Sequence, residues 1–235
     1  GRGLESLLEM NMATDLASFT AALDRHGAPS ANITYADRDG HILFRTIGLI
    51  PERGSGRGLY PVAGNDSANQ WAAVVDDSQL PRLTDPRTGY VAAANSRVHS
   101  GRPLVSADNA AGYRMHRLDA ILGARRDFTL EDMQALQMDM HNSQAEKLLP
   151  AMLPALSGLA EGTALEAFHI LREWADSPVN NADSSGALLW EYWYPELARD
   201  VFGHGLDEEL LGRLMRRNYV LNHAMDRLIL VDHGS

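Results

Sequence analysis

Two polar residues beside apolar segments are the first candidates for chemistry. Asn32 opens the apolar, β-branched segment 32–36, although an amide side chain is uncommon in a strand. Such an asparagine either lies at the edge of a sheet, caps the end of the strand, or directs its side chain towards a functional group. Arg53 follows the next apolar segment and carries a permanent positive charge. With Arg57 close by in the sequence, Arg53 is equally consistent with a solvated loop arginine.

The other reactive residue types do not form a recognisable catalytic or metal site. Cysteine is absent, which excludes disulfides and thiol catalysis. The nine histidines include no HExxH pattern, and His116 and His141 are expected in helices as packing or surface residues. The spacing of Asp37, Asp39 and Asp66 matches no calcium-binding loop, so solvated turns are expected there.

Composition and charge exclude several kinds of partner. The net charge is −10, Lys147 is the only lysine, and no basic stripe is present, so nucleic acid is not an expected partner. No apolar run approaches the length that spans a bilayer. The glycine-rich segment 54–58 lacks the Lys-Ser/Thr ending of a phosphate-binding loop and does not lead from a strand into a helix.

The first half of the chain is expected to contain the strands that position Asn32 and Arg53. Two apolar runs flank Asp39-Gly40, and this pattern predicts a tight hairpin over residues 32–48. Residues 49–69 are expected to form a long surface loop, and Trp71 is expected in the core. Helices are predicted over residues 4–13 and from Thr14-Asp15 to about Gly27, and short strands over 70–75 and 89–94.

After about residue 106 the pattern becomes helical. Thr129 is the predicted N-cap of a helix that runs through Met140, with Phe128 and Met133 as a hydrophobic staple. The aromatic cluster 190–194 is expected to pack a helix against its neighbours, with the lining of an acyl pocket as the alternative. Further helices are predicted over residues 112–122, 148–159, 163–175, 187–201 and 206–221. The sequence therefore predicts an α+β protein with a strand-containing portion, 1–105, and a helical portion, 106–235.

The order of these segments resembles the penicillin acylase (penicillin amidase) family of N-terminal-nucleophile hydrolases. The matching segments extend from about Gly1 to Leu153. They are Asn32-x-x-Tyr35-x-Asp37-x-x-Gly40-x-Ile42, Gly48-x-x-Pro51-x-Arg53, Leu59-x-Pro61-Val62-x-Gly64, Trp71, Leu80-Pro81, Asp85-Pro86-x-x-Gly89-Tyr90-Val91-Ala92-x-Ala94-Asn95, Tyr113-Arg114-x-x-Arg117-Leu118 and Phe128-Thr129-Leu130-Glu131-Asp132-Met133-x-x-Leu136-Gln137-x-Asp139. The resemblance implies part of an αββα fold, followed by a mostly helical second half.

The resemblance also implies a reaction. Members of this family hydrolyse amide bonds with a serine at the amino terminus of the large subunit, and the α-amino group of that serine is the base. By resemblance, Asn32 helps to stabilise the oxyanion and Arg53 organises the surroundings of the nucleophile. The chemistry requires no cofactor or metal. Some members hold a structural calcium ion, whose ligands this sequence does not identify.

The family's nucleophilic serine is not found in this sequence. No serine stands in the Ser-Asn-Asn or Ser-Asn-x-Trp context of that nucleophile. We therefore expect an internal fragment of the large (β) subunit, inactive alone. Its expected partners are the rest of that subunit, the small subunit of the same precursor, and a small-molecule acyl amide as substrate. A periplasmic or secreted enzyme is the implied localisation.

Two other interpretations remain at this point. One is a non-catalytic binding module that keeps the acylase scaffold without its nucleophile. The other is a generic mixed interaction domain whose resemblance to the family is accidental. The reading frame upstream of Gly1 would discriminate between the acylase and the binding module, because only the acylase requires the processed serine there.

Overall fold

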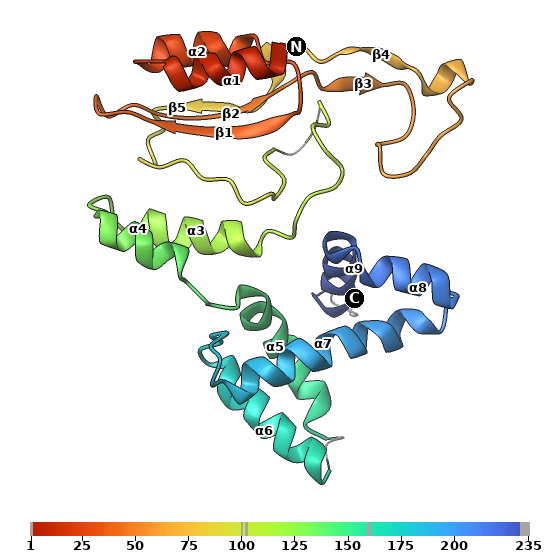
Figure 1. Ribbon diagram of the computed structural model, residues 1–235. Coiled ribbons are helices and arrows are strands. Elements are labelled where there is room, and N and C mark those ends of the chain that lie inside the picture. Colours follow the sequence, from red (N-terminus) through yellow and green to blue (C-terminus); the bar gives the residue numbers. More distant parts are fainter. Residues whose placement is uncertain (1, 100, 102, 159–160, 231–235) are drawn as a thin grey trace. The chain divides into compact units, whose positions relative to one another are not determined.

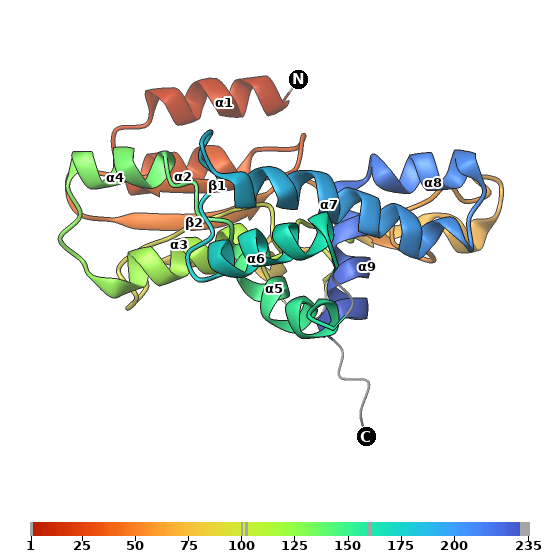
Figure 2. The ribbon, with the colours of Figure 1, turned by 90° about the horizontal axis from the view of Figure 1, so that it is seen from below.

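The chain folds into two compact units that divide between Arg126 and Asp127. The computed structural model describes residues 2–99, 101, 103–158 and 161–230 (Figures 1 and 2). Among these residues, all named strands lie in unit 1 (1–126), whereas the named elements of unit 2 (127–235) are helices. The expected change from strands to helices near residue 106 does not coincide with the division between the two units. The first helix after residue 106, α3 (Tyr113–Ala124), still belongs to unit 1.

Unit 1 contains a three-stranded antiparallel sheet in the order β1-β2-β5. Strands β1 (Ala31–Ala36) and β2 (Ile42–Ile47) form the predicted hairpin. Its turn contains Gly40 at φ +92°, a conformation that glycine adopts without a steric penalty. Strand β5 (Arg82–Thr84), which the sequence did not indicate, pairs with the other side of β2. Strand β2 is therefore central, and residues 43–47 are buried.

Helices α1 (Arg2–Met12) and α2 (Leu16–Asp24) lie on one side of this sheet (Figure 1). Helix α2 begins with a capping box between Asp15 and Ser18, as expected for a start near Thr14-Asp15. In β1 the residues alternate between half-buried and exposed, and the half-buried ones face this core. The core of the unit consists of buried Leu23, Leu43 and Ile47, packed by Met10, Leu16, Phe19, Ala31, Ile33 and Tyr35.

A second, two-stranded sheet is formed by β3 (Pro51–Arg53) and β4 (Trp71–Val74). The long connection between them contains the 3-10 turn η1 (Ser67–Asn69). Trp71 is 65% exposed, so the expectation of a core tryptophan is wrong. All four residues of β4 are exposed, because an apolar side chain becomes core only where another layer covers it. A further turn, η2 (Asp77–Gln79), leads into β5.

The strand predicted over residues 89–94 is absent, and that prediction is wrong. The segment is apolar, but no neighbouring strand provides its backbone with hydrogen-bonding partners. Asn95, at φ +59°, follows this segment, and its side chain has a structural role. Its Oδ1 accepts a hydrogen bond from Nη2 of Arg114 at 3.0 Å, and the same nitrogen donates to the carbonyl of Ala94.

Unit 2 is built from helices. They are α4 (Leu130–Gln137), α5 (Ser143–Leu156), α6 (Thr163–Ala175), α7 (Ser185–Gly203), α8 (Glu208–Met215) and α9 (Asn218–Leu230). Thr129 caps α4 as predicted, in a capping box with Asp132. Helix α4 ends at Gln137, before the predicted Met140. Within the described residues, no helix has the length and apolar character needed to cross a bilayer.

Two local predictions for unit 2 are wrong. The single helix expected over 206–221 is divided between α8 and α9, with a turn at Arg216 and Arg217. The two parts pack against different neighbours, α8 against α7 and α9 against α5, and one straight helix could not do both. His141 lies outside a helix, in an isolated bridge with Val179, and its Nε2 bonds Glu146 at 3.0 Å.

The core of unit 2 contains more buried residues than the core of unit 1, and these residues are apolar or aromatic. Trp190 stacks on Tyr194 with ring centroids 4.9 Å apart, so the cluster 190–194 packs helix α7 as predicted. Burial raises the pKa of Tyr194. The buried residues of this core are Ala145, Leu148, Leu149, Met152, Leu171, Trp190, Tyr194, Ala198, Leu221 and Met225.

Candidate functional site

Asn32 lies on the face of β1 opposite to the residues that pack against α2. It is exposed, and its cross-strand partner in β2 is Thr46. The Thr46 N–H donates to the carbonyl of Pro81, away from β1, at 2.9 Å. Asn32 and Thr46 are therefore a pair that does not exchange backbone hydrogen bonds, the arrangement in which facing side chains approach most closely. The Thr46 Oγ1 donates to the Asn32 Oδ1 at 2.8 Å.

This contact leaves the donor end of the Asn32 amide free. The Oδ1 is engaged by Thr46, and the Nδ2 has no hydrogen-bond acceptor among the described residues. A side-chain amide carries two N–H donors on that nitrogen. Asn32 can therefore donate hydrogen bonds to an anionic oxygen that approaches the exposed face of β1.

Arg45 lies on the face of β2 opposite to Thr46, and its side chain is only 3% exposed. Its Nη2 donates to Asp24 Oδ1 at 2.5 Å and to Asp77 Oδ2 at 2.7 Å. Asp77 also pairs with Arg82. The network joins the end of α2, strand β2 and turn η2. Arg45 is more than twenty residues from each of its two carboxylates, so the sequence provided no signal for it.

Arg53 lies in the second sheet, at a bulge after Glu52. Its guanidinium packs against Gly58, where the Cβ of any other residue would come within 3.1 Å of Nη2. Arg53, Arg57 and Arg97 line a hollow of about 680 Å³, and none of the three has an ion-pair partner among the described residues. Asn32 is not among the described residues that line this hollow, so Arg53 and Asn32 do not share it.

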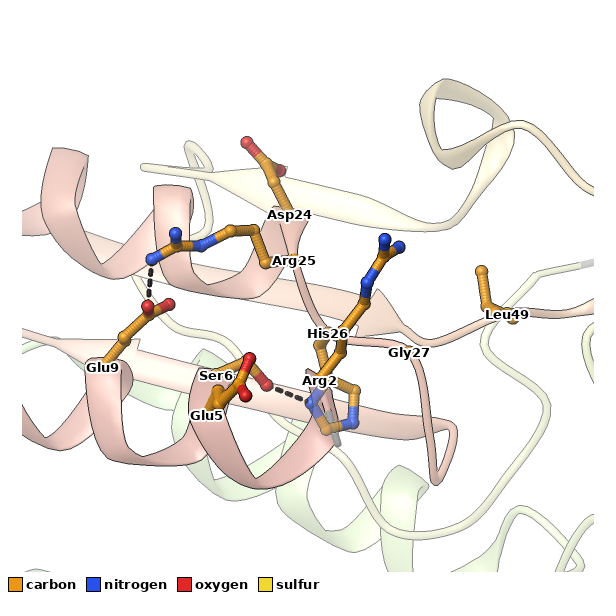
Figure 3. Close-up of a pocket in the computed structure, with 9 residues that line it drawn as sticks. All are labelled: Arg2, Glu5, Ser6, Glu9, Asp24, Arg25, His26, Gly27 and Leu49. Atoms are coloured by element: carbon orange, nitrogen blue, oxygen red, sulfur yellow. Dashed lines mark hydrogen bonds and ion pairs between the residues drawn. The ribbon is translucent and has the colours of Figure 1, made fainter.

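A buried Ser–His pair, which the sequence did not reveal, lies beside a cavity of about 450 Å³ (Figure 3). Ser6 Oγ is 2.7 Å from His26 Nδ1, and His26 Nε2 is 2.8 Å from the carbonyl oxygen of Pro29. Since a carbonyl only accepts, Nε2 donates to Pro29, while Ser6 Oγ contacts Nδ1 and also donates to the carbonyl of Gly3 at 2.9 Å.

The geometry makes this pair a structural contact and not a nucleophile with its base. Ser6 is 1% exposed, so a substrate carbonyl has no access to its hydroxyl. The second ring nitrogen of His26 bonds a backbone carbonyl, whereas a catalytic histidine is oriented by a group that stabilises its positive charge. The pair connects α1 to the turn after α2, and its members are twenty residues apart in the sequence.

A polar cluster holds the closed end of the hairpin against the residue after β5. Asp85 Oδ2 lies 2.8 Å from His41 Nδ1, and Asp85 Oδ1 accepts from the Ile42 N–H. The hydrogen bond with Asp85 raises the pKa of His41. The Ile42 N–H, followed by the His41 ring, lowers the pKa of Asp85. Asp37 accepts from the backbone of Asp39 and His41, so it forms the expected turn.

The described residues do not contain a set of ligands for a metal ion. No group of three or more histidine, aspartate or glutamate side chains converges in that part of the chain. Ligands for a structural calcium ion are therefore not assigned to any residue.

The sequence of this chain is similar to those of known acylases. A sequence model of the family described as penicillin amidase matches residues 1–233. The acyl-homoserine lactone acylase QuiP of Pseudomonas syringae pv. syringae (strain B728a) is 29% identical over 238 residues, covering 88% of this chain and 28% of QuiP. The penicillin acylase 2 proenzyme of Pseudomonas sp. (strain SE83) is 27% identical over 154 residues, covering 65% of this chain and 20% of that protein. The chain thus spans less than a third of the length of these relatives.

A solved structure has the same fold. The thermostable penicillin G acylase from Alcaligenes faecalis superposes with a TM-score of 0.71 at 18% identity, over 90% of this chain and 39% of that one. At this identity the match shows the fold alone. It confirms the predicted fold class, a portion of an α+β N-terminal-nucleophile hydrolase.

Proposed function

Since the chain belongs to the penicillin amidase family, we propose that it is part of an acylase that hydrolyses acyl amide bonds through an acyl-serine intermediate. Within that enzyme Asn32 donates hydrogen bonds to the oxyanion. Arg53, which has no acidic partner among the described residues, organises the surroundings of the nucleophile. The named relatives are acylases, which supports the reaction class.

The observation that carries the proposal is the oriented amide of Asn32. When a hydroxyl attacks an acyl carbon, negative charge develops on the former carbonyl oxygen, and donors already in place stabilise it. Asn32 is exposed, its Oδ1 is held by Thr46, and its Nδ2 hydrogens are free of partners within the described residues. This is the orientation that an oxyanion requires, because a carbonyl oxygen in the same place would repel it.

The nucleophile of the proposed enzyme is a serine outside this chain. The relatives are several times longer than the chain, so their length accommodates such a residue and the small subunit. The serine hydroxyl would transfer its proton to its own α-amino group, whose pKa of about 8 suits a base near neutral pH. The rest of the large subunit and the small subunit are the proposed partners, in a periplasmic or secreted enzyme.

The proposed substrate is a small-molecule acyl amide. The relatives' names include both an acyl-homoserine lactone acylase and a penicillin acylase, and both activities break an amide between an acyl group and a small amine. No metal is needed for this chemistry, because the oxyanion is stabilised by hydrogen bonds and the base is an amine.

Replacement of Asn32 in the complete enzyme tests the proposal. We expect Asn32→Ala to lower kcat by about 10²–10³-fold with little change in KM, because the oxyanion exists only after attack. Thr34→Ala is the matched control, since Thr34 is exposed on the same face of the same strand and forms no hydrogen bond with its side chain in the described part of the chain. Equal activities of the two variants would refute the role of Asn32, and absence of amide hydrolysis by the complete wild-type protein would favour a non-catalytic scaffold.

A further inference from the structure

We propose that Thr46 is a positioning residue that fixes the orientation of the Asn32 amide, an inference that rests on the proposed function. An asparagine amide has two orientations of nearly the same shape, related by rotation about χ2. One presents the Nδ2 hydrogens to a ligand and the other presents the carbonyl oxygen. Only the first stabilises an oxyanion, so the residue that selects it contributes to the rate without touching the substrate.

The burial of Thr46 makes the selection strong. Thr46 is 1% exposed, and its hydroxyl donates to Asn32 Oδ1 at 2.8 Å. That oxygen is the acceptor for this hydroxyl within the described residues. If the amide turned over, Nδ2 could donate to Oγ1, but the hydroxyl hydrogen would lose its acceptor in a place that water does not reach. A buried donor without an acceptor is unfavourable, so the observed orientation is retained.

The backbone around Thr46 is also held in place. Its N–H bonds the carbonyl of Pro81 at 2.9 Å, and the preceding Arg45 is anchored by two carboxylates. Two residues later the chain passes Gly48, at φ +104°, where a Cβ would lie 2.7 Å from the Cα of Ser30. The end of β2 and the start of β1 are therefore packed closely, and this packing gives the Thr46 hydroxyl a defined position for its hydrogen bond to Asn32.

The test compares Thr46 variants in the complete enzyme. We expect Thr46→Val, which keeps the shape but removes the hydroxyl, to lower kcat roughly 10-fold with KM unchanged, because the amide is no longer held in alignment. Thr46→Ser retains the hydroxyl and should restore a kcat close to wild type. Thr46→Ala replaces the valine variant if the latter does not fold.

A double-variant cycle separates positioning from general stability. In an Asn32→Ala background, Thr46→Val should have no further effect on kcat, because the group that it positions is gone. If the two losses multiply instead, Thr46 acts through the fold and the inference is overturned.

The same measurements distinguish failure of this inference from failure of the proposed function. If Asn32→Ala lowers kcat but Thr46→Val leaves it at the wild-type value, the inference fails while the oxyanion role stands. If Asn32→Ala itself leaves kcat unchanged, the proposed oxyanion role of Asn32 fails, and the inference fails with it.

Discussion

The two units differ in what their interiors contain. In unit 1 the buried side chains include Ser6, His26, Arg45 and Thr46, whereas in unit 2 the buried residues of the described segments are apolar or aromatic. The apolar core of the sheet in unit 1 is small and is packed by half-buried neighbours. The core of unit 2 joins four helices around a stacked Trp190–Tyr194 pair.

The difference shows how each unit obtains a unique structure. A buried polar group is unfavourable unless it has a partner, so each polar contact in unit 1 specifies one arrangement of its strands and helices. The contact between Thr46 and Asn32 belongs to this set and lies at the proposed site. Unit 2 depends on shape and apolar burial, which tolerate many sequences but define a rigid helical body.

The largest effect on stability is expected in the core of unit 2. Trp190→Ala should destabilise that unit by about 3–5 kcal/mol, because it removes a buried indole and leaves a cavity. Tyr192→Ala on the same helix is the control, since Tyr192 is 73% exposed and its loss should cost under about 0.5 kcal/mol. Hydrogen exchange of the amides in each unit would measure the free energy of opening and show whether the loss is confined to unit 2.

A smaller effect is expected from the polar interior of unit 1. Asp24→Ala combined with Asp77→Ala leaves the buried Arg45 charge without either carboxylate. The loss should be about 2–3 kcal/mol, below the full value for a buried pair, because both carboxylates are half exposed and screened by water. Chemical denaturation monitored by hydrogen exchange in unit 1 would measure it.

A surface pair in unit 2 is the matched control for this double variant. Arg213 and Glu209 form an exposed i,i+4 pair on α8, and Glu209→Ala should cost only about 0.3–0.5 kcal/mol. Equal losses in the two experiments would contradict the view that buried charge distinguishes the interior of unit 1.

The smallest effect concerns pH and the closed end of the hairpin. Because the folded pKa of His41 is raised above its ordinary value of 6.5, the stabilisation from its pairing with Asp85 is complete below pH 6.5. It is lost as the pH rises through the raised pKa. The pKa of Asp85 is lowered from 3.8, so its own contribution is present above that value and is lost as the pH falls through the lowered pKa.

An NMR titration would measure this pair directly. In Asp85→Asn the pKa of His41 should fall towards its ordinary value, and the melting temperature should lose the part of its pH dependence that this pair causes. The amide oxygen of the variant can still accept from Ile42, so the backbone contact is preserved. An unchanged His41 titration would show that Asp85 is not its partner in solution.

Elements with local signals were predictable from the sequence. The Asp39-Gly40 turn predicted the hairpin, and the capping box at Thr129 predicted the start of α4, because both signals involve residues close in the sequence. The candidate Asn32 was found in the same way, as an amide at the head of an apolar strand. Its role in catalysis and that of Arg53 stay predictions.

Predictions that required knowledge of a distant neighbour failed. The apolar segment 89–94 lacks a strand partner, Trp71 lacks a covering layer, and the helix expected over 206–221 is divided because α8 and α9 pack on different helices. Burial and strand pairing are properties of two segments together, so one segment cannot reveal them.

The sequence by itself determined the family, the mixed fold class and the positions of most helices and of the first hairpin. Only the tertiary structure decided which polar groups are buried and which partners satisfy them: Ser6 with His26, Arg45 with its two carboxylates, and Thr46 with Asn32. The physical reason is that periodicity and turn chemistry act over a few residues, whereas the cost of burying a polar group is offset only by a partner that folding brings from far along the chain.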